Sequence, residues 1–87
     1  MTRSVPTLAE GWLVESFEEG SALYHPGAER VVDLNATATL VLRLCDGERD
    51  VAAIAELLAE AYPDDGVAAD VARVVSELVS AGVLVVA

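Results

Sequence analysis

The chain has 87 residues, 54% hydrophobic and 23% charged, which suits one small globular domain and excludes a disordered one. Fifteen acidic residues against five basic ones give a net charge of -10. This balance argues against a nucleic-acid partner and against an anionic membrane surface, because both attract clustered Lys and Arg. No signal peptide, membrane-spanning run or pair of cysteines is visible, so we expect a cytoplasmic protein.

The first half of the chain predicts strands. Residues 1–10 are expected to form a flexible arm, because Pro6 and the Ser and Thr residues disfavour regular structure, and residues 11–87 a single domain. Three strand candidates follow, separated by turns at Gly20 and at Pro26-Gly27, and they cover 12–17, 21–25 and 29–34. In the third, alternation places Val32 and Leu34 on one face and Val31 and Asp33 on the other.

The second half predicts three helices and a short terminal strand. Asn35 and Asp50 are suitable N-caps for the first two helices, and Gly47 is a suitable stop for the first. The expected helices cover 35–45, 50–62 and 67–81, and the strand covers 83–86. The fold class is therefore α+β and winged helix-turn-helix-like: a three-stranded antiparallel meander, then three helices and a short C-terminal strand.

The third predicted helix has an unusually broad apolar surface. Its polar positions, which include Asp70, Arg73 and Glu77, cover one side, and the remaining apolar arc is about 180° wide. A helix that packs on one core needs an arc of only about 100°. Either the helix is buried on two sides or part of the arc lines an open groove, and the pattern alone leaves both possibilities open.

Side chains that enzymes use for catalysis are scarce. The chain has one His, one Cys and no Lys. His25 precedes a turn proline and is expected at the surface, and Cys45 lies on the apolar stripe of the first helix and is expected to be a buried, inert thiol. No second ligand supports a metal site, and no phosphate-binding loop is present. We therefore expect a binding module without catalytic activity, metal or cofactor.

Several short motifs, taken in order, resemble those of one family. Leu34-Asn35-Ala36-Thr37-Ala38, followed by Leu44-Cys45-Asp46-Gly47, resembles the L-N-x-T-A … L-x-D-G core of the PqqD-like proteins. Asp50 stands where that family more often has Thr, and Cys45 where it more often has a larger apolar residue. The remaining matches are Arg49-Asp50-Val51 with Ile54, Leu58 with Tyr62, Asp70-Val71, Leu78, and Gly82-Val83-Leu84.

This resemblance implies a peptide recognition element for ribosomally synthesised and modified peptides (RiPPs). Such proteins bind the leader of a precursor peptide as an extra strand, with its apolar side chains in a groove between the third strand and the third helix. Acidic side chains on the helix are expected to select basic leader residues. The expected binding residues are Arg30, Val31, Val32 and Asp33 of the strand and Asp70, Val71, Val74, Glu77 and Leu78 of the helix.

The resemblance also implies the partners. A leader-binding protein delivers the leader to a cysteine leader peptidase in lasso-peptide biosynthesis or to a radical SAM maturase in the biosynthesis of pyrroloquinoline quinone (PQQ). Compact size and the terminal strand favour the stand-alone lasso type. The alternative is an acidic winged-helix module for protein–protein interaction or regulation. A DNA-binding regulator would need a basic recognition helix, whereas the third helix has only Arg73 against Asp70 and Glu77.

Overall fold

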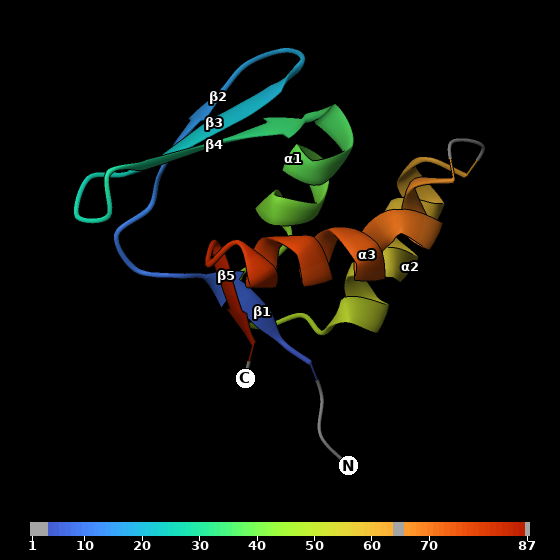
Figure 1. The fold of residues 1–87 in the computed structure, drawn as a ribbon. Coiled ribbons are helices and arrows are strands. Elements are labelled where there is room, and N and C mark those ends of the chain that lie inside the picture. The colour runs from blue at the N-terminus through green and yellow to red at the C-terminus, as the bar shows by residue number, and fades with distance from the viewer. Residues whose placement is uncertain (1–3, 64–65, 87) are drawn as a thin grey trace.

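A computed structural model describes residues 4–63 and 66–86. Figure 1 shows a three-stranded sheet on one side of the molecule, joined through α1 to the other helices, with a second small sheet at the chain ends. This confirms the predicted architecture and adds one strand at the start of the chain. The elements are β1 (Pro6–Leu8), β2 (Leu13–Ser16), β3 (Gly20–His25), β4 (Arg30–Asn35), α1 (Ala36–Arg43), α2 (Val51–Ala61), α3 (Val67–Ser80) and β5 (Leu84–Val86).

The meander places β3 between β2 and β4, with antiparallel pairing on both sides. Among the described strands, β4 therefore has a partner on one side only. The predicted alternation is also present: Leu23 is buried and Val32 is half-buried on the face toward the helices, whereas Tyr24 and Val31 are exposed on the outer face. Among the described strands, the side of β4 that faces away from β3 is therefore open to a further strand.

The N-terminal segment differs from the predicted flexible arm. Residues 6–8 form β1, which pairs antiparallel with β5 at the other end of the chain. The backbone around it is also bonded, because the Ser4 carbonyl accepts the Val51 N–H at 3.0 Å and the Pro6 carbonyl accepts the Gly47 N–H at 3.1 Å. Pro6 itself is fully buried. Residues 1–3 of the predicted arm lie outside the described residues.

Both predicted helix caps are confirmed. The Asn35 side chain accepts the Ala38 N–H at 2.8 Å at the start of α1. The Asp50 side chain accepts the Ala53 N–H at the same distance at the start of α2. Each bond satisfies one of the N–H groups that a helix leaves unpaired in its first turn.

The first helix ends earlier than predicted. Leu44 is its C-cap, and Leu44 and Cys45 donate N–H bonds to carbonyls three residues back, at 3.1 and 3.0 Å. These shorter-range bonds tighten the last turn and release the chain before Gly47. Gly47 instead lies in the connection to α2, where its φ of 81° suits a residue without a side chain.

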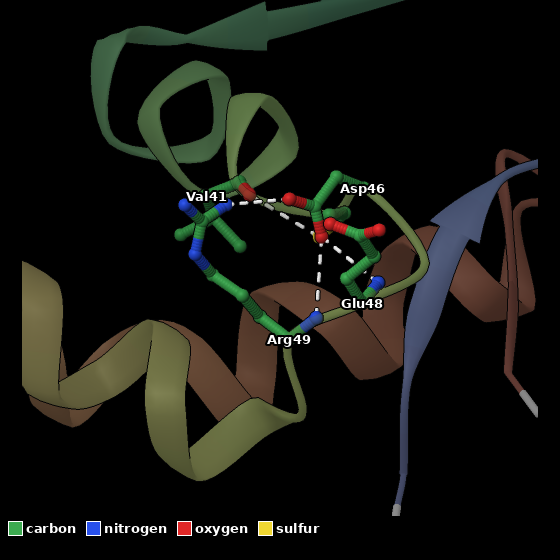
Figure 2. A network of polar contacts seen from close by, with 5 residues as sticks. Val41, Asp46, Glu48 and Arg49 are labelled. Carbon is green, nitrogen blue, oxygen red and sulfur yellow. Dashed lines mark hydrogen bonds and ion pairs between the residues drawn. The ribbon is translucent and has the colours of Figure 1, made fainter.

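Asp46 holds the connection between α1 and α2 together (Figure 2). Its Oδ1 accepts the backbone N–H groups of Glu48 and Arg49 at 3.0 and 3.2 Å, and its Oδ2 lies 2.6 Å from the Arg49 guanidinium. These interactions, led by the Glu48 N–H, hold the pKa of Asp46 below its ordinary value. The short, polar connection between α1 and α2 therefore has a defined shape.

The hydrophobic core lies between the inner face of the meander and the three helices. No helix in 4–63 or 66–86 has the length and apolar character needed to cross a membrane. The α3 helix contributes more core residues than either of the others. The largest fully buried side chains are Leu23, Val41, Ile54, Val71, Val83 and Leu84, together with Pro6.

Candidate functional site

The hairpin between β2 and β3 fixes the direction of the backbone bonds across the meander. The Phe17 N–H donates to the Gly20 carbonyl at 2.8 Å, so Gly20 directs its polar groups toward β2. In an antiparallel ladder, successive residues direct their N–H and C=O groups to alternate sides. Ser21 and Leu23 therefore bond toward β4.

The register carries this alternation onto β4. Leu23 lies opposite Val32, so Val32 directs its backbone groups toward β3. Its neighbours Val31 and Asp33 direct theirs the other way, where the described residues contain no further strand. Two N–H and two C=O groups thus form an open backbone edge that an extended chain can pair with.

Trp12 ties the start of β4 to the end of α3. Its indole Nε1 donates to the Gly82 carbonyl at 3.0 Å. The Arg30 guanidinium carbon lies 5.5 Å from the centre of the Trp12 ring, within cation–π range, and His25 meets the same ring edge-on with centroids 5.2 Å apart. The predicted site residue Arg30 is therefore exposed, but its guanidinium is already engaged with the Trp12 ring.

A second polar contact anchors the other end of β4. The Ser21 and Thr39 hydroxyls lie 2.9 Å apart in a buried position, and the Thr39 hydroxyl also donates to the Asn35 carbonyl at 2.8 Å. These bonds fix the start of α1 against the sheet directly after β4. The open edge is consequently framed by α1 at one end and by Trp12 at the other.

The three apolar residues predicted on the helix side are part of the core. Val71, Val74 and Leu78 are exposed by 0%, 4% and 4%, so they do not line an open groove in this structure. The exposed part of the broad apolar arc lies elsewhere: Ala72 and Val79 line a hollow of about 440 Å³. Its other walls come from Ser4, Val51 and Val86, on the side of β5 rather than β4.

The two predicted acidic residues on α3 share one basic neighbour. Arg73 lies 3.4 Å from Asp70 and 3.0 Å from Glu77, and the hydrogen bonds to Glu77 and then to Asp70 raise the pKa of Arg73 above its ordinary value. Helical spacing places Asp70, Val74 and Glu77 on one face of α3. Arg73 therefore offsets part of the negative charge of these two acidic side chains.

Sequence reasoning did not single out the outer face of the meander. There Leu13, Tyr24 and Val31 are exposed by 60%, 45% and 65% and lie opposite one another in register. Alternation within 12–17 was visible in the sequence, but which face would be covered by helices was not. Trp12 was likewise assigned only to a strand, although it joins the sheet to α3.

The one Cys and the one His of the chain each have a hydrogen-bond partner within the protein. Burial, and to a smaller extent the Asp46 charge, raises the pKa of the Cys45 thiol to about 11, so the thiol is protonated at neutral pH. His25 Nδ1 accepts the Ala28 N–H at 3.0 Å within its own turn. The described part of the chain contains no cluster of three or more His, Cys, Asp or Glu side chains placed to hold a metal ion.

Known protein families and relatives match most of this region. Residues 20–84 match the family model described as Coenzyme PQQ synthesis protein D (PqqD). A PqqA binding protein of Klebsiella pneumoniae is 42% identical over 52 residues, which are 60% of this chain and 54% of that protein. A PqqA binding protein of Pseudomonas paraeruginosa is 41% identical over 63 residues, 70% of this chain and 66% of that protein. The chain therefore spans about half the length of the first relative.

Solved structures share the fold. The PqqD truncation of Methylobacterium extorquens PqqCD, described as a functional, stand-alone RiPP recognition element, is 33% identical with a TM-score of 0.72, over 93% of this chain and 88% of that one. Lasso peptide synthetase B1 complexed with the leader peptide is 22% identical with a TM-score of 0.76, over 93% of this chain and 98% of that one. TbiB1 in complex with the TbiA(beta) leader peptide is 15% identical with a TM-score of 0.74, over 90% of this chain and 93% of that one. The last two comparisons establish the likeness of fold alone.

Proposed function

The chain belongs to the PqqD family, and from this membership we propose that it is a non-catalytic recognition element that binds the leader of a precursor peptide in RiPP biosynthesis. The leader adds to β4 as a further antiparallel strand. The observation that carries this proposal is the open edge at Val31 and Asp33, whose outward N–H and C=O groups have no partner strand among the described residues. Main-chain bonds of this kind supply much of the affinity when an extended peptide joins a sheet.

The neighbouring α3 surface supports the same role. A leader paired with β4 directs alternate side chains toward the helices. In the proposed complex these side chains lie between Asp70 and Glu77, over the core layer that Val71, Val74 and Leu78 form. The buried residues thus shape the site from below, and a charge placed among them would disturb the fold before it disturbed binding.

We further propose that the bound leader is handed to a separate processing enzyme. A radical SAM maturase is supported by the PqqA binding proteins at 41% and 42% identity, and a cysteine peptidase by the fold shared with lasso peptide synthetase B1. A synthetic PqqA peptide and a synthetic lasso-precursor leader separate the two classes. Isothermal titration with each peptide is expected to give saturable binding for one class only.

A pair of proline variants tests where the leader binds. In Val31→Pro the lost N–H points outward, so the β3–β4 ladder keeps all its bonds while the leader loses one. We expect the dissociation constant of the preferred peptide to rise about tenfold or more, from the lost bond and the altered edge. Val14→Pro is the matched control, because the Val14 N–H also points away from β3, but at the edge of the opposite outer strand, β2. Equal affinities of the two variants would contradict binding at β4.

A further inference from the structure

The outer face of the meander carries an apolar row that reaches the open edge. Leu13 on β2, Tyr24 on β3 and Val31 on β4 are directly opposite one another and all exposed. A hollow of about 420 Å³ lies over this row. The solvent side of an antiparallel sheet is ordinarily polar, so three adjacent exposed apolar side chains there mark a contact surface.

The next row along the same face is acidic at both edges. Glu15 on β2 and Asp33 on β4 flank the small Ala22. Within 4–63 and 66–86 the Asp33 carboxylate has neither an ion pair nor a hydrogen bond, whereas Asp70 and Glu77 share Arg73. Asp33 is therefore the uncompensated negative charge on the strand that forms the open edge.

We propose that this outer face selects the leader sequence: a basic residue opposite Asp33 and, two positions later, an apolar residue opposite Val31. The inference rests on the proposed function, because it requires a leader strand on β4. The outward backbone groups of Asp33 and Val31 make each of them one half of a hydrogen-bonded pair with the leader. Side chains of such a pair lie on the same face, with Cα atoms about 5.5 Å apart.

The chemistry of each position follows from the row it extends. A leader side chain opposite Val31 becomes the fourth member of the apolar row and covers surface that is now in water. A Lys or Arg opposite Asp33 forms a cross-strand ion pair, whereas Asp or Glu there is repelled. Because an antiparallel leader runs opposite to β4, the residue facing Asp33 precedes the residue facing Val31. The acidic helix residues, already paired with Arg73, contribute less to this choice than Asp33 does.

Selection from a displayed library of random nonapeptides tests this order. Wild-type protein is expected to enrich Lys or Arg two positions before an apolar residue, and Asp33→Lys is expected to enrich Asp or Glu at the first of these positions. For a matched pair of selected peptides, the charge reversal should change the dissociation constant by roughly three- to thirtyfold in opposite directions. Glu15→Lys is the control: it makes the same change in the same row, but about 10 Å further from the open edge, and should leave the preference unaltered.

The outcomes separate this inference from the proposed function. Peptides that bind wild-type protein with no charge preference, or with the same preference in Asp33→Lys, would overturn the outer-face selection while leaving leader binding in place. Enrichment in the reverse order would also overturn it, since the strand would then run parallel. A library that yields no binder to wild-type protein, or binders that are insensitive to Val31→Pro, would instead refute strand addition itself.

Discussion

The Cys45 thiol is held in a chemically quiet state by its surroundings. It is buried, its Sγ donates to the Val41 carbonyl at 3.2 Å, and its pKa is raised to about 11. Because the thiolate is the nucleophile, we predict that native protein at pH 8 reacts with iodoacetamide at least tenfold more slowly than the same protein in denaturant. Mass spectrometry of the alkylated chain measures both rates. Equal rates would show that the thiol is accessible in the folded protein.

Trp12 joins the segment before β2 to the end of α3 through its bond to the Gly82 carbonyl. In Trp12→Phe the Gly82 carbonyl loses its indole donor and Arg30 loses part of its ring contact. We predict a loss of about 1–3 kcal/mol of unfolding free energy, since a partly buried acceptor is left without its partner. For a domain of this size, each kcal/mol lowers the melting temperature by roughly 4–8 °C.

Circular dichroism is the appropriate readout for that variant, because Trp12→Phe removes the only tryptophan and hence the usual fluorescence signal. Tyr24→Phe serves as the control. Tyr24 is an exposed aromatic residue on the outer face, and its loss of a hydroxyl should change stability by less than about 0.5 kcal/mol. A Trp12→Phe protein as stable as this control would show that the bond to Gly82 contributes nothing.

At the level of elements, β1 connects the C-terminal strand β5 with the region around the start of α2. Its segment bonds to the α1–α2 connection through Pro6 and Gly47, to α2 through Ser4 and Val51, and to the chain before β5 through the Ala9 N–H and the Val83 carbonyl at 2.9 Å. We predict that deletion of residues 1–9 lowers the free energy of unfolding by about 3 kcal/mol or more. Each lost hydrogen bond accounts for about 1 kcal/mol, and the loss of buried surface adds to this. Thermal unfolding measures this cost. An unchanged melting temperature would restore the flexible-arm interpretation.

The sequence predicted those elements whose sequence signals come from residues close together in the chain. Asn35 and Asp50 cap their helices because each bond spans only three residues, and the alternation of Val31 and Val32 needs no knowledge of the rest of the fold. The family resemblance, based on motifs around Asn35 and Gly82, is confirmed by the match to residues 20–84. By contrast, β1 exists only because β5 returns to its side, and a pairing between chain ends leaves no local pattern.

The candidate site could be predicted only in part, for the same reason. Val31 and Asp33 were expected on an exposed edge strand, and the structure has them there. The breadth of the apolar arc on α3 was visible, but its allocation depends on what surrounds the helix: Val74 is in the core and Val79 lines the hollow on the β5 side. The contact of the Arg30 guanidinium with the Trp12 ring also depends on tertiary structure that no sequence period records.

The whole molecule combines a strongly acidic composition with a sheet whose two outer strands, β2 and β4, are both unpaired on one side among the described elements. The β2 edge of one copy can pair with the β4 edge of another, and such head-to-tail contacts extend into filaments when the rotation between copies does not close a ring. At low ionic strength, mutual repulsion between copies of charge -10 opposes this growth. Concentrated salt weakens that protection and would favour filaments, whereas a peptide seated on β4 blocks elongation at its source. Leader binding at β4 would therefore stop the growth of filaments made of its own binding protein.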